Sequence, residues 1–135
     1  MRTKLILGIA VLCIVGAAFL AGMWVGHSFI PPFSTALNSP DLLEPVQGAV
    51  LKRDGQQAFS WSKVPQAEKY HIYIAHSGNM DRPIVDQEME VNVFQMSPQW
   101  FSVSTGWTWK VKAQVDGEWS KWSEVRSFDV EPDGK

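Results

Sequence analysis

The stretch Trp107-Thr-Trp-Lys-Val-Lys-Ala113 alternates apolar and polar side chains with a period of two. Successive side chains of a β-strand point to opposite faces, so Trp109, Val111 and Ala113 are predicted to face a core. Four other runs alternate in the same way: 58–62, 70–74, 89–93 and 126–130. Turn-forming residues lie between the runs, at Arg53-Asp-Gly55, Ser77-Gly-Asn79, Ser104-Thr-Gly106 and Asp116-Gly117. The pattern predicts an all-β protein, an antiparallel sandwich of about seven strands.

Several segments resemble the successive strands of a fibronectin type III domain, an immunoglobulin-like fold: Pro45-Val-Gln-Gly48, Phe59-Ser-Trp61, Ala67–Ile74, Trp107–Ala113 and Phe128-Asp-Val130. The resemblance implies that Trp61 is the core tryptophan of the second strand. Tyr70, Ile72 and Ile74 would face it from the third. The family usually has tyrosine at the position of Trp107, and the tyrosine hydroxyl bonds to backbone at a corner. Tryptophan has one N–H donor and no acceptor, so this corner is either rebuilt or lost.

The stretch Trp119-Ser-Lys-Trp-Ser123 resembles the tryptophan-serine repeat of class I cytokine receptors, in which tryptophans stack with basic side chains of a neighbouring strand. The candidate stacked ladder joins Trp119 and Trp122 to basic residues that share the outward face or follow it, namely Lys110, Lys112 and Arg126. The only cysteine is Cys13, so the disulfides of those receptors have no counterpart in the domain. The repeat is therefore interpreted as a structural feature shared with many bacterial fibronectin-like domains.

The stretch Leu5–Gly26 contains no charged residue. A helix of this length reaches about 33 Å, enough to cross a hydrocarbon core of about 30 Å. Arg2 and Lys4 precede it, whereas the flank 27–33 has no lysine or arginine. The positive-inside rule then predicts a cytoplasmic N-terminus and a periplasmic or extracellular domain on a cell membrane. A cleaved signal peptide is the alternative, although its apolar region is usually only about 7–15 residues long.

The expected organisation has five parts: a cytoplasmic N-terminus (1–4), one transmembrane α-helix (5–26), a tether with proline and serine (27–40), the β-domain (41–131) and a C-terminal tail (132–135). Ala18, Gly22 and Gly26 form a small-residue stripe in the predicted helix. Such a stripe lets a second helix approach closely, so other protein subunits are expected partners. Glycine and alanine are also common in membrane helices, and the stripe could reflect composition alone.

Charge and motifs point away from several function classes. Beyond the predicted helix there are 10 basic and 14 acidic residues, so a nucleic-acid partner is not expected. His27, His71 and His76 lack metal-ligand spacing. Asp86, Glu88 and Glu90 alternate, but the loop pattern of calcium motifs is missing. No nucleophile motif or phosphate loop occurs. The sequence predicts no metal, no cofactor and no enzymatic activity.

Exposed aromatic residues remain as a candidate contact surface for a protein or a glycan: His71, Tyr73, Trp100 and Phe101. Aromatic residues also cover the ends of sandwiches, which is the alternative interpretation.

The sequence favours an accessory or structural subunit of a larger membrane complex, such as a transport, respiratory or photosynthetic one. A free-standing adhesion or glycan-binding module is the alternative, and a receptor-like signalling role is the third hypothesis.

Overall fold

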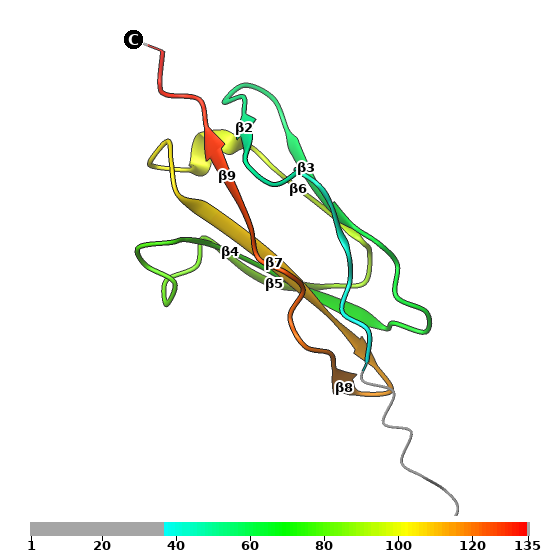
Figure 1. Cartoon of the computed structure of the whole chain (residues 1–135). Helices are drawn as coiled ribbons and strands as arrows, with labels where there is room; N and C mark the ends of the chain where they lie inside the picture. The colour runs from blue at the N-terminus through cyan, green and yellow to red at the C-terminus, as the bar shows by residue number, and fades with distance from the viewer. Residues whose placement is uncertain (1–36, 135) are drawn as a thin grey trace, which may run out of the picture. The chain divides into compact units, whose positions relative to one another are not determined.

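The computed structural model describes residues 37–134, which form two β-sheets packed face to face (Figure 1). The smaller sheet has the order β1-β3-β6, with β1 at Leu42–Glu44, β3 at Gln57–Trp61 and β6 at Val93–Met96. The larger sheet has the order β2-β9-β7-β4-β5, and β8 pairs with β7. Its strands are β2 (Ala49–Leu51), β4 (Lys69–His76), β5 (Val85–Met89), β7 (Trp107–Val115), β8 (Glu118–Trp119) and β9 (Arg126–Val130). All pairs are antiparallel except β2 with β9.

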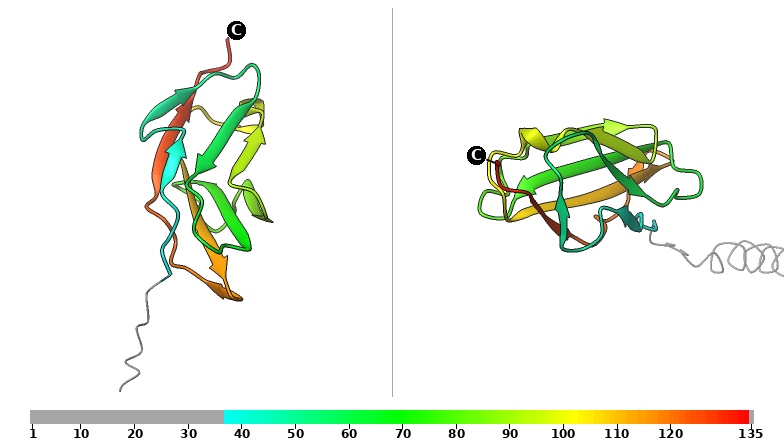
Figure 2. Two further views of the ribbon diagram at one scale, coloured as in Figure 1. Left: turned by 90° about the vertical axis from the view of Figure 1, so that its right-hand side faces the viewer. Right: turned by 90° about the horizontal axis from the view of Figure 1, so that it is seen from above.

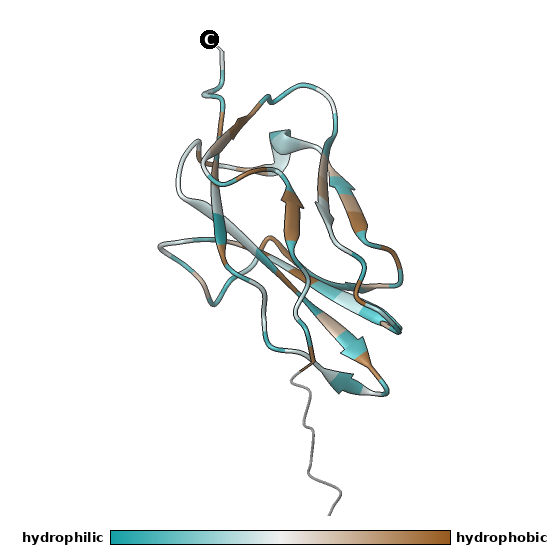
Figure 3. Ribbon diagram, turned by 45° about the vertical axis from the view of Figure 1, so that its right-hand side comes forward, coloured by the Kyte–Doolittle hydropathy of each residue, from teal (hydrophilic) through white to brown (hydrophobic). Residues whose placement is uncertain are grey.

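The predicted all-β sandwich is confirmed, and its core follows the predicted parity. Hydrophobic and hydrophilic segments are interspersed over the longer strands (Figure 3), and the register places Ile72 opposite Val111 and Ile74 opposite Trp109. The side chains predicted to face the core are all buried: Trp61, Tyr70, Ile72, Ile74, Trp109, Val111, Ala113 and Phe128. Phe59 joins the sheets through edge-to-face contacts, with ring centroids 5.3 Å from Trp109 and 5.5 Å from Phe128. Such pairs add specific geometry to the apolar burial.

The predicted strand at 89–93 is wrong. Met89 ends β5, Val93 begins β6, and the residues between them carry the chain from one sheet to the other. There Asn92 donates from Nδ2 to the Trp61 carbonyl at 2.8 Å, and the Trp61 amide donates to the Asn92 carbonyl at 3.2 Å. The alternation of Asp86, Glu88 and Glu90 is therefore interrupted, because Glu90 lies outside β5.

The described residues have nine strands rather than about seven. The predicted strand at Pro45–Gly48 is wrong, because these residues connect β1 to β2, which join different sheets. Proline has no N–H to donate to a strand pairing, which suits this connection. The extra strand β8 follows a two-residue turn, in which Asp116 and Gly117 both have positive φ, 50° and 77°. Two such residues form the type I′ hairpin turn that Asp-Gly favours.

The corner at Trp107 is rebuilt. The Trp107 indole donates from Nε1 to the Val103 carbonyl at 2.8 Å, so an N–H group makes the bond to backbone. The ring packs against Phe101, with centroids 4.7 Å apart. A bond from the aromatic tip to nearby backbone therefore persists without the hydroxyl.

The first described residues and the C-terminus lie at opposite ends of the sandwich (Figures 1 and 2). Asp41 exchanges hydrogen bonds with Ser62, close to the end where β4 begins. The 3-10 helix Pro98–Trp100 and the β4–β5 loop lie at the other end. Between residues 37 and 134, no helix is long and apolar enough to span a bilayer. The predicted transmembrane helix at 5–26, with Ala18, Gly22 and Gly26, lies outside the described residues.

Candidate functional site

The outer face of the larger sheet combines two groups of candidate residues. Tyr73 on β4 lies opposite Lys110 on β7, and His71 lies opposite Lys112. All four side chains are half-buried. Because their inward neighbours Ile72, Ile74, Trp109 and Val111 are in the core, these four side chains point away from it.

Two tryptophans complete an alternating row of aromatic and cationic groups, which we name the ladder. Lys112 Nζ lies 5.0 Å from the Trp119 ring centroid and 4.6 Å from that of Trp122. Lys110 Nζ lies 4.5 Å from the Trp122 centroid and 5.2 Å from that of Tyr73. All four distances are within the range of about 6 Å for a cation–π interaction, worth about 0.5–1 kcal/mol each at exposed sites. The row therefore runs Trp119, Lys112, Trp122, Lys110, Tyr73.

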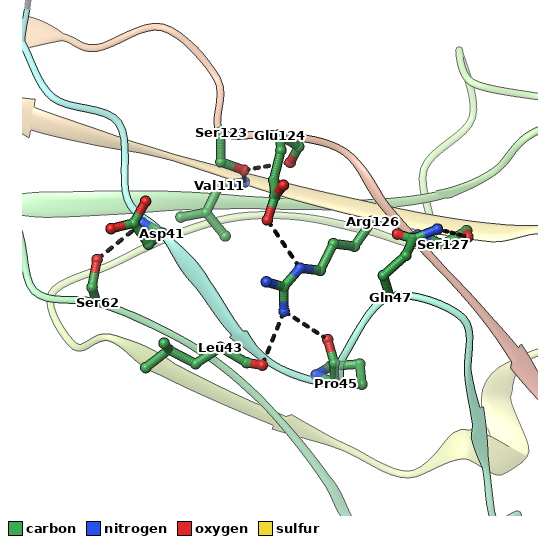
Figure 4. A network of polar contacts seen from close by, with 10 residues as sticks. All are labelled: Asp41, Leu43, Pro45, Gln47, Ser62, Val111, Ser123, Glu124, Arg126 and Ser127. Carbon is green, nitrogen blue, oxygen red and sulfur yellow. Dashed lines mark hydrogen bonds and ion pairs between the residues drawn. The ribbon is translucent and has the colours of Figure 1, made fainter.

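Two buried serines hold the ladder's tryptophans against β7. The Val111 amide donates to Ser123 Oγ at 3.0 Å, and the Ser123 amide donates back to the Val111 carbonyl at 2.8 Å (Figure 4). Ser120 makes the same pair of bonds with Ala113, at 3.0 and 2.7 Å. Each serine thus satisfies a stretch of β7 edge that no strand covers. Both serines are buried against β7, whereas both tryptophans lie over the lysines of its outer face, so residues three apart share a side of the segment.

Arg126 does not belong to the ladder, and its predicted place there is wrong. It shares parity with the buried Phe128, so its side chain points toward the smaller sheet rather than outward. Its guanidinium donates to the Leu43 carbonyl at 3.0 Å and to the Pro45 carbonyl at 3.4 Å (Figure 4). It also pairs with Glu124 at 3.0 Å. Arg126 therefore links the two sheets.

Tyr73, predicted as a contact residue, belongs to the ladder, and His71, predicted likewise, lies beside it. The His71 ring lies 5.2 Å from Trp122 and 5.9 Å from Trp119, and its Nε2 contacts the Asp86 carboxylate. The Tyr73 hydroxyl donates to the Met80 carbonyl. Their polar groups have partners within the domain, which leaves only part of each ring open to solvent.

The two remaining contact candidates differ in their exposure to solvent. Trp100 is 67% exposed, whereas Phe101 is fully buried and packs on Trp107 and Phe128. Phe101 is therefore wrong as a surface residue. Phe101 directly follows the 3-10 helix, and its side chain is buried in the core. A pair of adjacent aromatic residues in a loop carries no periodicity from which this difference could be predicted.

A hollow that sequence reasoning missed lies at the end where β4 finishes, and we name it the distal hollow. Its volume is about 410 Å³. The β4–β5 and β6–β7 loops supply its principal walls: His76, Asn79, Arg82, Ile84, Val103 and Trp107. A smaller hollow of about 290 Å³, at the end where β4 begins, includes Lys63 and Glu90. Because both hollows join loops distant in sequence, local patterns could not reveal them.

Within the part of the chain that the structure describes, no group of three metal-ligating side chains converges. Asp86 and Glu88 on β5 instead have local partners. Asp86 contacts His71, and Glu88 pairs with Lys69 at 3.8 Å. The acidic strand thus makes cross-strand contacts on the sheet face.

No family model matches the chain, and no curated protein matches it. Among solved structures, the chain is similar to a β-1,2-glucanase from Parabacteroides distasonis, with 22% identity and a TM-score of 0.51 over 73% of this chain and 13% of that one. An α-L-rhamnosidase from Dictyoglumus thermophilum gives 17% identity and a TM-score of 0.51, over 72% and 13% of the two chains. A Fn3-like protein from Clostridium thermocellum gives 17% identity and a TM-score of 0.49, over 74% and 99%.

The chain thus spans only 13% of the length of the first two proteins. At these identities the likeness concerns the fold alone. The sheet topology by itself shows an immunoglobulin-like β-sandwich, with β1-β3-β6 packed against β2-β9-β7-β4-β5.

Proposed function

We propose that the chain is a non-enzymatic single-pass membrane protein and an accessory or structural subunit of a larger membrane complex. Residues 5–26 form its transmembrane span, with the N-terminus in the cytoplasm. The fibronectin type III-like domain then lies in the periplasm or outside the cell and makes protein–protein contacts. The charge asymmetry around the apolar stretch supports this orientation.

The observation that carries the proposal is the exposure of large apolar side chains at the end of the domain remote from residue 37. Trp100 is 67% exposed, Val103 45% and Ile84 37%. Tryptophan is enriched among the residues that dominate protein–protein binding energy. An end surface of this kind, on a domain held at the membrane, suits contact with another subunit.

A free-standing adhesion or glycan-binding module is the second candidate, and the exposed Trp100 ring favours it, since a sugar ring could stack there. The ladder argues against a wider aromatic platform. Lysine ammonium groups already lie over both Trp119 and Trp122. Trp100 is then the indole that remains open for a sugar among these three, so the accessory subunit is preferred.

Replacing both Gly22 and Gly26 with isoleucine should reduce recovery of the complex while leaving membrane insertion intact. The segment becomes more apolar but loses the surface that allows close helix approach. The measurement is the amount of partner protein per full-length chain after affinity purification in mild detergent. Ala17→Ile is the matched control, because in an α-helix Ala17 would point about 140° away from Gly22 and about 180° away from Gly26.

Equal recovery of partner protein with the double variant and with Ala17→Ile would show that the stripe is only compositional. A lone monomer from wild-type membranes, with affinity for sugars, would support the adhesion alternative.

A further inference from the structure

The distal hollow has walls that are held in place before any partner binds. Gly78 N–H donates to His76 Nδ1 at 3.1 Å, and His76 Nε2 lies 3.1 Å from the Thr105 carbonyl. Trp107 is fixed by its bond to Val103 and lies 5.5 Å from the His76 ring. A Cβ on Gly106 would approach His76 Nε2 to 2.9 Å, so this backbone position fits glycine. Preformed walls reduce the ordering cost of binding.

The apolar and charged parts of the hollow lie side by side. Ile84, Val103 and Trp107 provide apolar surface, while Arg82 is exposed on the same lining. In the described part of the chain, no carboxylate lies within 4.0 Å of the Arg82 guanidinium. The lining contains no aspartate or glutamate, although acidic residues outnumber basic ones in the domain. The hollow therefore offers a cationic group in a domain whose net charge is negative, and it favours an anionic partner group.

The hollow lies at the end of the domain opposite its first described residues. The chain enters beside the start of β4, and the hollow lies at the end of the same strand. Eight residues of strand separate the two ends, which is about 26 Å. If the domain is tethered at a membrane through its N-terminal side, the hollow is on the end remote from the tether.

We propose that the distal hollow is the docking site for a loop or terminal segment of a partner subunit, which inserts an apolar side chain against Val103 and Trp107 and places a carboxylate on Arg82. This inference rests on the proposed accessory-subunit function and assigns its contact surface. Trp100 borders the site in sequence, two residues before the lining residue Ser102, and would pack beside the inserted segment. Tryptophan and arginine, both present in this lining, are enriched among the residues that dominate interface binding energy.

The test is site-specific photocrosslinking in cells that express the full chain. A photoreactive phenylalanine derivative replaces Val103, and a parallel variant carries it at Val91, which is 56% exposed and lines the opposite hollow. The crosslinked peptide is identified by mass spectrometry. We expect one partner peptide from Val103 that has aspartate, glutamate or a C-terminal carboxylate within about two residues of an apolar side chain.

Changing the charge of Arg82 gives the second arm. Arg82→Glu should lower the Val103 crosslink by about tenfold, whereas Arg82→Lys should largely preserve it. Crosslinks to lipid, glycan or a second copy of this chain would overturn the proposal. So would a peptide without a carboxylate, or an equal yield from Arg82→Glu. If a stoichiometric complex is still recovered in mild detergent while Val103 gives no crosslink, the docking site is refuted and the accessory function stands.

Discussion

Replacing Trp61 with alanine should lower the free energy of unfolding by about 3–5 kcal/mol, the usual cost of truncating a core aromatic residue. Trp61 is fully buried and packs edge-to-face on Tyr70, with ring centroids 5.7 Å apart. The Tyr70 hydroxyl accepts a bond from the Val64 amide at 3.0 Å, which limits how far the ring can move to fill the space. The measurement is urea unfolding of the full chain in mild detergent, compared through the midpoint and slope.

Trp100→Ala is the matched control for this prediction. It removes the same side chain from an exposed position and should change stability by no more than about 0.5 kcal/mol. Trp61→Phe should cost less than Trp61→Ala, because it retains an aromatic ring and removes an indole N–H that has no hydrogen-bond partner in the described structure. If Trp61→Ala and Trp100→Ala had equal effects, the placement of Trp61 in the core would be wrong.

Replacing Ser123 with alanine should destabilise the domain by about 1–3 kcal/mol, since a buried donor loses its acceptor. The Val111 amide donates to the Ser123 hydroxyl, and that hydroxyl donates to the Glu124 carbonyl at 2.8 Å. Ser120→Ala should behave similarly, through the Ala113 amide and the Lys121 carbonyl. Hydrogen exchange provides a local measurement: the Val111 amide should exchange faster in Ser123→Ala, and the Ala113 amide in Ser120→Ala.

Ser102→Ala is the control for the serine prediction, because Ser102 is exposed and makes none of these bonds to β7. It should leave exchange at Val111 and Ala113 unchanged. Unaltered protection in Ser123→Ala would contradict the role given to the serine hydroxyls, and the tryptophan-serine segment would then be held by its ladder contacts alone.

The alternation of inward and outward side chains along each strand gave the most correct predictions of burial. In β7, alternation alone separates Trp109 and Val111 from Lys110 and Lys112, because a strand has only two faces. The same rule indicated that both lysines are available to Trp119 and Trp122. Arg126 also obeys the rule, because it shares parity with Phe128 and points inward, and its predicted place in the ladder went against that parity. At 89–93, alternation continued through residues where the chain changes sheet.

Contacts between loops were not predictable in this way. The distal hollow depends on the bond from the Ser77 amide to the Gly106 carbonyl and on the edge-to-face contact of His76 with Trp107, which join two connections. The serine bonds to β7 had a weak sequence signal, the repeat of serine after tryptophan at a spacing of three. The repeat has a structural role because the segment runs along β7, where each serine hydroxyl accepts a hydrogen bond from a β7 amide.

The measurement that tests the central claim most directly is the location and intact mass of the mature chain. An uncleaved membrane anchor at 5–26 predicts a chain of about 15.2 kDa that begins at or near Met1. It should stay in the membrane fraction after a high-salt wash, because burial of an apolar helix in lipid does not depend on ionic strength. A soluble product that begins near Phe29 would contradict the account.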